Sequence, residues 1–256
     1  MIKSVLITGG GSGIGAALAV ALAKCNCEVI ISGRRPENLM SVARQSSRIT
    51  PHSADVTNAD DQDALAEAFS KLPSPRALFH GAGYFQLGQL HTLPSEDWRR
   101  SFDTNVTARW ALSSKCADDL VGGRILFVGS DSGANVRVGA AAYSIAQSAS
   151  ETLRRALQAE WSHRDIAVAG FKPGLVDTDL VQGLLAAPEA EFPSRISFQN
   201  YIDSGECASP EKIAVFAAWL MLDVETTRFA ATEWDIRKTD HHSEWLKGQL
   251  YDRNQG

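Results

Sequence analysis

The chain has 256 residues, of which 44% are hydrophobic and 21% charged, a composition typical of a globular protein. Its formal net charge of −5 argues against a nucleic-acid-binding protein, in which clustered lysine and arginine are expected. No apolar run approaches the roughly 18 residues of a membrane span, and the N-terminus lacks the apolar core of a signal peptide.

Short apolar segments alternate with helix-forming segments along the chain. Apolar runs predict strands within residues 4–8, 28–32, 48–56, 77–80, 122–130, 166–174 and 233–237. Helices are predicted between them, over residues 13–25, 36–45, 58–72, 94–120, 141–161 and 209–222. Ser95 and Ser209, at the starts of the helices over 94–120 and 209–222, are expected to cap them. Strands that are apolar on both faces and alternate with helices indicate one α/β domain, a parallel sheet covered on both sides.

Residues 180–209 have the least regular pattern. We interpret them as an excursion over the C-terminal edge of the sheet, where ligands bind in this architecture. Phe192, Phe198 and Tyr201 in this excursion would form the walls of a pocket for an apolar substrate. The alternative is a lid or interface segment that does not contact substrate.

The turn between the first strand and the first helix, TGGGSGIG, spaces Gly9, Gly13 and Gly15 as G-x-x-x-G-x-G. A tight reversal, a close approach to a pyrophosphate and a close strand–helix packing all favour glycine. The amides of the helix N-terminus would face the anion. A glycine-rich string directly between a strand and a helix therefore predicts a dinucleotide site, against the alternative of a flexible turn without a ligand.

Two arginines end the second strand. An acidic residue at this position would accept hydrogen bonds from the adenosine ribose, whereas Arg34 and Arg35 offer cations that suit a 2′-phosphate. The pair favours NADP over NAD as the cofactor. The alternative is a pair of solvated arginines near the start of a helix.

Cysteines and histidines do not predict a metal site. Cys25, Cys27, Cys116 and Cys207 are too sparse for a disulfide framework and indicate a reduced, cytoplasmic protein. The adjacent His241 and His242 in the tail over residues 237–256 have no further ligand spaced to close a site, so no metal is expected. Trp234 and Trp245 are expected to pack this part of the chain on the body or against another subunit.

From residue 3 to about 222 the chain resembles the short-chain dehydrogenase/reductase family. Its motifs follow the family's order: TGGGSGIG, ADV with Asp55, HGAG over residues 80–83, TNVTA with Asn105, Ser130 thirteen residues before Tyr143, and KPG followed by Thr178. His80 stands where the family usually has asparagine, and we interpret it as a hydrogen-bonded residue at a strand end rather than as a proton carrier. The resemblance implies a Rossmann-like three-layer α/β/α sandwich with a seven-stranded, mostly parallel sheet.

The family's reaction is hydride transfer between a nicotinamide cofactor and a carbonyl or alcohol. The resemblance implies a small-molecule substrate and a homodimer or homotetramer formed through the long helices after strands four and five. It implies catalytic positions at Ser130, Tyr143, Asn105 and Gln147. It implies cofactor contacts from Thr8, Gly9, Gly13, Ile14, Gly15, Arg34, Arg35, Asp55, Val56, Gly81, Ala82, Gly83, Pro173, Gly174 and Thr178.

Gln147 departs from the family's pattern, which has lysine four residues after the tyrosine. Residues four apart share a helix face, so Gln147 can reach the same ribose hydroxyls but brings no charge. A unit charge about 5 Å from the phenolate, at an effective dielectric constant of about 20, is worth roughly 3 kcal/mol. Carbonyl reduction suffers less from the loss of this charge than alcohol oxidation. In reduction the tyrosine starts protonated, whereas oxidation needs the phenolate. Lys172 is the nearest other cation that the sequence suggests.

These features predict an NADP-dependent reductase of a carbonyl on a small apolar substrate, with Tyr143 as general acid and Ser130 as hydrogen-bond donor to the carbonyl oxygen. Asn105 would belong to a proton-conducting water chain. The alternative is a weak or inactive NADP-binding member of the family that acts as a regulatory or interaction protein. Neither nucleic acid nor membrane is expected as a partner.

Overall fold

The sheet in the computed structural model, which describes residues 1–189 and 191–251, has seven parallel strands in the order β3-β2-β1-β4-β5-β6-β7. The strands are β1 (Ser4–Thr8), β2 (Glu28–Gly33), β3 (Ile49–Ser53), β4 (Arg76–His80), β5 (Arg124–Val128), β6 (Ala167–Lys172) and β7 (Trp234–Asp235). The predicted fold class is confirmed. The order reverses between β1 and β4, and ligands of such sheets bind at the C-terminal ends of the strands at this point.

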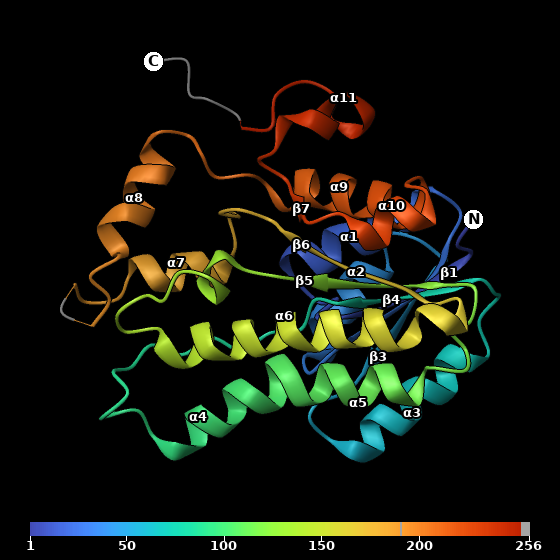
Figure 1. Cartoon of the computed structure of the whole chain (residues 1–256), viewed down its shortest axis with the longest axis horizontal. Coiled ribbons are helices and arrows are strands. Elements are labelled where there is room, and N and C mark those ends of the chain that lie inside the picture. Colours follow the sequence, from blue (N-terminus) through green and yellow to red (C-terminus); the bar gives the residue numbers. More distant parts are fainter. Residues whose placement is uncertain (190, 252–256) are drawn as a thin grey trace.

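Helices cover both faces of the sheet (Figure 1). They are α1 (Gly13–Lys24), α2 (Pro36–Ala43), α3 (Ala59–Ser70), α4 (Ser95–Phe102), α5 (Ala108–Lys115), α6 (Ala141–Trp161), α7 (Asp179–Leu185), α8 (Arg195–Asp203), α9 (Pro210–Leu222), α10 (Thr226–Ala231) and α11 (His242–Trp245). Short 3₁₀ turns lie at Asp131–Gly133, Ser162–Arg164 and Thr239–His241. Ser209 caps α9 as predicted, whereas Ser95 is already the first residue of α4 and Pro94 precedes it without a side-chain cap.

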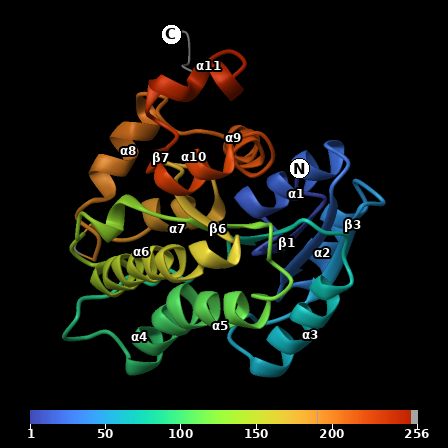
Figure 2. The same cartoon turned by 45° about the vertical axis from the view of Figure 1, so that its right-hand side comes forward.

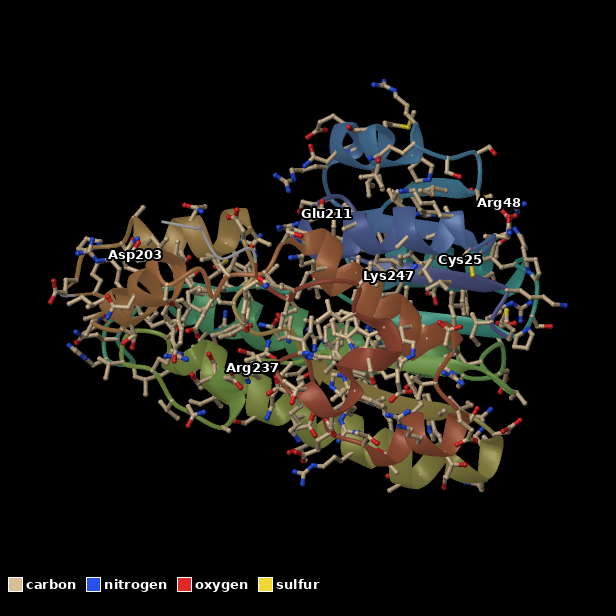
Figure 3. The ribbon with its side chains drawn as sticks, turned by 90° about the horizontal axis from the view of Figure 1, so that it is seen from above. Cys25, Arg48, Asp203, Glu211, Arg237 and Lys247 are labelled. Carbon is tan, nitrogen blue, oxygen red and sulfur yellow. The ribbon has the colours of Figure 1, made fainter. Side chains whose placement is uncertain are left out.

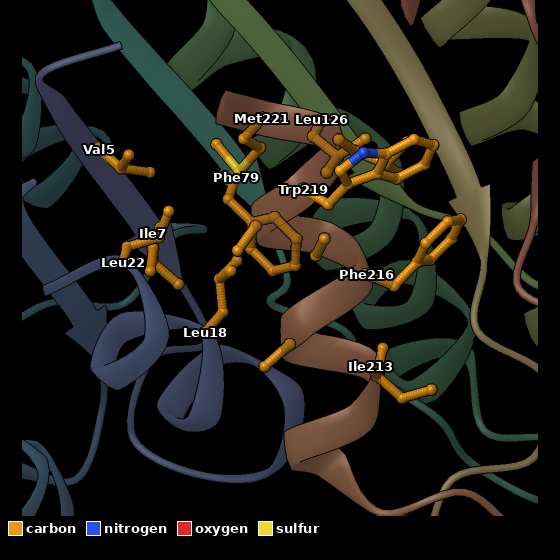
Figure 4. Close-up of a cluster of buried hydrophobic side chains, with 14 of the residues drawn as sticks. Val5, Ile7, Leu18, Leu22, Phe79, Leu126, Ile213, Phe216, Trp219 and Met221 are labelled. Atoms are coloured by element: carbon orange, nitrogen blue, oxygen red, sulfur yellow. The ribbon is translucent and has the colours of Figure 1, made fainter. Parts of the chain in front are cut away.

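Alternate residues of the five central strands, β2, β1, β4, β5 and β6, enter two separate cores. Val5 and Ile7 of β1 pack with α1, α2 and α9, while Leu6 packs with α3, α5 and α6. Figure 4 shows the first core, with Leu18 of α1 beside Phe79 of β4 and with Phe216 and Trp219 of α9. Because both faces of every central strand are buried, the strands read as continuous apolar runs rather than as alternating patterns.

The helix predicted over residues 94–120 is divided. A π-helical turn, η1 (Asp103–Thr107), lies between α4 and α5, and it includes the buried Asn105. The Asn105 side chain accepts a hydrogen bond from the Tyr84 amide at 3.2 Å and donates to the carbonyls of Tyr84 and Ser101 at 2.8 and 2.9 Å. A π turn of this kind is frequent near functional sites.

The predicted excursion over residues 180–209 contains α7 and α8 and returns to the body where it left. Val176 and Ala208 form a parallel bridge, and the Asp177 amide donates to the Ala208 carbonyl at 3.0 Å. Figures 1 and 2 both show α7 next to the start of α6. Figure 3 places Asp203, at the end of α8, at the opposite end of the molecule from Arg48, which precedes β3. The excursion therefore lies beyond the C-terminal ends of the strands.

The tail packs on the body through its aromatic rings. Trp245 donates a hydrogen bond from its indole nitrogen to Nδ1 of His241 at 2.9 Å, and both rings lie against Phe216 of α9. The Nε2 atoms of His241 and His242 bond to the carbonyls of Asp235 and Ile236. These histidines hold the backbone of the tail. Residues 252–256 of the predicted tail lie outside the described residues.

Two further findings concern the described part of the chain. None of its helices is both long and apolar enough to cross a membrane. Its four cysteines are all free, and it holds no group of three or more side chains arranged to bind a metal ion.

Candidate active site

A cavity of about 940 Å³ opens at the C-terminal ends of the strands, where the strand order reverses. Three groups of predicted residues line it together. They are Gly9, Gly13, Ile14 and Gly15 of the first turn, Arg34, Arg35, Asp55 and Val56 after β2 and β3, and Gly81, Ala82, Gly83, Ser130, Tyr143, Gln147, Pro173, Gly174 and Thr178 around β4, β5 and β6.

Backbone geometry leaves no room for side chains at Gly9 and Gly15 of the glycine turn. A Cβ on Gly15 would lie 2.3 Å from the Gly9 carbonyl oxygen, and one on Gly9 would lie 2.8 Å from the Ala82 amide nitrogen. Gly9 and Gly13 also have φ angles of 71° and 51°, in the left-handed region that favours glycine. The turn thus brings β1, α1 and the turn after β4 into close contact and leaves the first amides of α1 facing the cavity, a geometry that fits a pyrophosphate.

The arginines after β2 form the polar end of the cavity. The Arg35 guanidinium donates to the Ser12 hydroxyl at 3.5 Å, and Arg34 lies close enough to Asp55 to help lower its pKa. Asp55 accepts hydrogen bonds from the amide and hydroxyl of Thr57, and these also lower its pKa, while its partial burial opposes them. Its carboxylate is therefore ionised and held by its own loop.

Thr8 and Asn105, two of the predicted site residues, do not line the cavity. Thr8 is buried behind its wall, where its hydroxyl accepts hydrogen bonds from the amides of Gly81 and Ala82 at 3.2 Å. Asn105 is fully buried and uses its amide group to fix the π turn. Both side chains shape the backbone around the cavity because their polar groups bond to buried main chain.

Ser130 and Tyr143 are brought together as the sequence predicted. Tyr143 lies in the first turn of α6, with its ring 4.7 Å from that of Phe85. Burial raises the pKa of the Tyr143 phenol, and a hydrogen bond with Ser130 and the positive charge of Arg109 oppose that rise. Tyr143 is therefore protonated at neutral pH and can act as a proton donor.

Gln147 lies one turn after Tyr143 on α6 and also lines the cavity. It is 4% exposed, and its carbonyl oxygen Oε1 has no hydrogen-bond partner. A buried acceptor left without a partner costs about 1–3 kcal/mol. An oxygen of this kind at the cavity wall is ready to accept a hydrogen bond from a bound group.

Lys172 is not at the site. It ends β6 in register with Asp235 of β7, and it does not line the cavity. The cation beside Tyr143 is Arg109 of α5, which the sequence did not single out. Arg109 follows Asn105 by four residues in the helix predicted over 94–120. This spacing was the only feature of the sequence that could have placed Arg109 near the site.

His80 is a hydrogen-bonded residue at the end of β4, as expected. Its Nε2 atom lies 2.8 Å from the Ser113 hydroxyl, and its ring lies 4.6 Å from that of Phe127. Burial, followed by the nearby charge of Arg109, holds the pKa of His80 well below its usual range. His80 is therefore neutral.

Aromatic side chains from the excursion close the other end of the cavity. Phe192, Phe198 and Tyr201 all line it, and Phe192 packs on Phe198 with ring centroids 5.5 Å apart. Phe192 is fully buried, in a small cluster with Ala140, Leu184 and Ala187. The excursion therefore supplies an apolar surface near Tyr143.

The tail reaches the site through one charged residue. Arg237 pairs with Asp131, next to Ser130, at 2.8 Å and with Asp235 at 2.6 Å. Figure 3 shows Arg237 near the centre of the molecule, between the excursion and α9. This network ties the turn that carries Ser130 to the last strand.

A family model described as short chain dehydrogenase matches residues 3–189. The cyclic-di-GMP-binding biofilm dispersal mediator protein of Escherichia coli strain K12 is 30% identical over 222 residues, 85% of this chain and 89% of that protein. The galactitol 2-dehydrogenase (L-tagatose-forming) of Cereibacter sphaeroides is 29% identical over 227 residues, 84% and 85% of the two chains. A solved structure from Beutenbergia cavernae with bound NADP at low occupancy has a TM-score of 0.77 and 24% identity, covering 91% of this chain and 93% of its own. The chain therefore belongs to the short-chain dehydrogenase family of oxidoreductases.

Proposed function

We propose that the protein is an NADP-dependent reductase of a carbonyl group on a small, largely apolar substrate, and that Tyr143 is the general acid. One observation carries this proposal: Tyr143 and Ser130 share one cavity with the glycine turn, and the apolar side chains of the excursion close that cavity. We also propose that residues 1–256 act as a single domain, with residues 180–209 as its substrate loop.

The cavity fits a nicotinamide dinucleotide, because side chains are excluded from the turn at Gly9 and Gly15 and because Gln147, whose buried Oε1 has no partner, lines the same space. When bound, the reduced cofactor supplies the hydride for the carbonyl carbon. Ser130 and Tyr143 would donate hydrogen bonds to the carbonyl oxygen, and the Tyr143 proton would move to that oxygen as its negative charge develops. The tyrosinate that remains would recover a proton from solvent.

Three residues support the choice and placement of the cofactor. Arg34 and Arg35 offer guanidinium groups where a 2′-phosphate would lie, and the loop after β2 has no carboxylate to repel it. The relative that contains NADP has the same overall fold. Gln147 would accept a hydrogen bond from a ribose hydroxyl through Oε1, which satisfies that oxygen.

The proposal is tested by two measurements on the purified protein. Fluorescence of the six tryptophans reports NADPH binding, and NADPH absorbance reports turnover on a panel of ketones and aldehydes. We expect binding and slow turnover, and we expect Tyr143→Phe to keep binding while losing turnover. Tight binding without turnover on any carbonyl would instead support a regulatory member of the family. A protein that does not bind NADPH would contradict both.

We also propose that the protein is a cytoplasmic homodimer or homotetramer that assembles through α4, α5 and α6. Trp110 of α5 is 53% exposed, and Ile145 of α6 and Trp98 of α4 are also exposed. These helices lie side by side on one face of the molecule (Figures 1 and 2). Large exposed apolar side chains on neighbouring helices are typical of an interface.

A further inference from the structure

Arg109 is a buried cation without an anionic partner. It is 4% exposed, and in the part of the chain that the structure describes no carboxylate forms an ion pair with it. Burial lowers the pKa of its guanidinium, but an arginine keeps its charge through the pH range in which a tyrosine titrates. A buried charge with no counter-charge is costly to keep, and stability alone does not explain its presence.

Its hydrogen bonds join three segments that frame the candidate site. The guanidinium donates to the Val128 carbonyl at 3.0 Å, to the Ser150 hydroxyl at 2.9 Å and to the Ala82 carbonyl at 3.3 Å. Val128 ends the strand that leads to Ser130, Ser150 lies three residues after Gln147 on α6, and Ala82 belongs to the turn after β4. All three acceptors are neutral, Nε has no partner and the guanidinium lies 5.8 Å from the Phe127 ring, so no anion among its hydrogen-bond partners cancels the charge.

Gln147 and Arg109 line the same cavity as Tyr143, but they come from different helices. We propose that Arg109 is a positioning residue that supplies from α5 the positive charge that Gln147 does not supply from α6, and that it acts through the phenol of Tyr143. This inference rests on the proposed role of Tyr143 as general acid. Proton transfer from Tyr143 to the substrate oxygen leaves a phenolate, and Arg109 stabilises that negative charge until solvent returns the proton.

The other charged or titratable groups near Tyr143 do not perform this role. Asp131 is paired with Arg237, and His80 is neutral because it is buried beside Arg109. Arg137 and Arg100 lie over the rings of Phe198 and Tyr84, at 4.8 and 4.7 Å, and neither contributes to the pKa of Tyr143. Among the charged groups, Arg109 alone contributes to the pKa of Tyr143, which it lowers.

The test is a pH titration of tyrosinate absorbance on the protein without cofactor, with Tyr143→Phe versions subtracted so that only Tyr143 is followed. We expect the Tyr143 pKa to rise in Arg109→Gln and Arg109→Met, which remove the charge, and to stay near its original value in Arg109→Lys, which keeps it. Reduction of a carbonyl at neutral pH should fall at least about tenfold in Arg109→Gln and much less in Arg109→Lys.

Arg124→Gln is the matched control. Arg124 lies at the other end of β5 and also donates to carbonyls, those of Leu220 and Val224, with its guanidinium 4.8 Å from the Phe229 ring. We expect this variant to lose stability without moving the Tyr143 titration. An equal shift in Arg124→Gln would mean that loosened packing, not charge, is being measured, and would overturn the inference.

A second variant keeps the arginine in place, should its removal prevent folding. Ser150→Asp puts a carboxylate on the position that now accepts a hydrogen bond from Arg109, and should raise the Tyr143 pKa by neutralising the guanidinium. An unchanged titration in Arg109→Gln or Ser150→Asp, or equal shifts in Arg109→Gln and Arg109→Lys, would overturn the role of Arg109. Because this titration needs neither NADPH nor turnover, its result is separate from the test of the proposed function.

Discussion

A tyrosine is protonated at neutral pH by its ordinary pKa, and the surroundings of Tyr143 raise that pKa further. Burial raises its pKa, while Ser130 and Arg109 oppose that rise without cancelling it. A phenol that keeps its proton is suited to donate it, so the direction of this pKa shift favours carbonyl reduction over alcohol oxidation.

The first prediction follows from the sign of that shift. The protonated phenol is the acid, and a raised pKa extends its range upward, so the reduction rate should stay level from neutral into alkaline pH and fall only as pH passes the Tyr143 pKa. The oxidation rate should rise over the same interval. Profiles of kcat/KM in both directions measure this. A reduction rate that already declines near neutral pH would show that another group donates the proton.

The second prediction concerns the buried oxygen of Gln147. Gln147→Met removes an acceptor that lacks a partner, so the free energy of unfolding without cofactor should increase by about 1 kcal/mol. Affinity for NADPH should fall. Gln158→Met on the same helix is the control, because Gln158 bonds to both Arg154 and the Ala230 carbonyl and its loss should destabilise the protein. Urea unfolding measures the stability of both variants. An equal loss of stability in Gln147→Met and Gln158→Met would mean that Oε1 of Gln147 does have a hydrogen-bond partner.

The third prediction concerns cofactor choice. Replacing Arg34 and Arg35 together by glutamine removes the cations proposed to bind the 2′-phosphate, and charge-assisted hydrogen bonds are worth about 1.5–3 kcal/mol. NADPH affinity should fall by roughly tenfold or more, while NADH affinity stays the same. Fluorescence titration with both cofactors gives the ratio. If the affinities for NADPH and NADH fall together, the arginines bind a group that both cofactors share, such as the pyrophosphate, or they stabilise the fold.

At the scale of elements, the glycine turn is the feature that sequence spacing describes best. Its glycines are needed because β1, α1 and the turn after β4 meet at backbone distance. The π turn between α4 and α5 had no such signal. A helical sequence pattern does not distinguish a π turn from an α-helix, and only the contacts of Asn105 with Tyr84 and Ser101 reveal it.

The fourth prediction tests that close packing. Gly15→Ala puts a methyl group 2.3 Å from the Gly9 carbonyl oxygen, so it should destabilise the protein by about 1–3 kcal/mol and weaken NADPH binding. Gly11→Ala is the control within the same turn, since its nearest atom would be 3.4 Å away and its φ is not in the left-handed region. Thermal unfolding of both variants measures the difference. Equal effects would mean that helix packing does not depend on Gly15.

At the scale of the whole molecule, the segments around the cavity come from every part of the chain. The tail pairs Arg237 with Asp131, and the excursion returns to its starting point through the bridge between Val176 and Ala208. The helices α4, α5 and α6 each line the cavity with one side and lie together at one face of the molecule, away from α11 of the tail (Figure 1).

The fifth prediction concerns that face. Trp110→Glu places a charge at the centre of the proposed interface and should shift the protein toward monomers in light scattering. Met40→Glu on α2 is the control, because Met40 is 46% exposed but lies in the opposite helical layer. If the wild-type protein is an oligomer and neither variant changes its molar mass, assembly uses another surface. If the wild-type protein is a monomer, the proposed interface is wrong.

The sequence by itself determined the parallel sheet with two helical layers, the glycine turn and the pairing of Ser130 with Tyr143. The sheet and the glycine turn are local properties, because strand burial and backbone turns depend on neighbouring residues, whereas the pairing of Ser130 with Tyr143 came from the resemblance to the family's spacing. Tertiary structure alone decided that Thr8 and Asn105 lie behind the cavity, that Lys172 lies away from it, and that Arg109 stands beside Tyr143. Such contacts join residues far apart in the chain, and they depend on how helices pack rather than on any spacing within them.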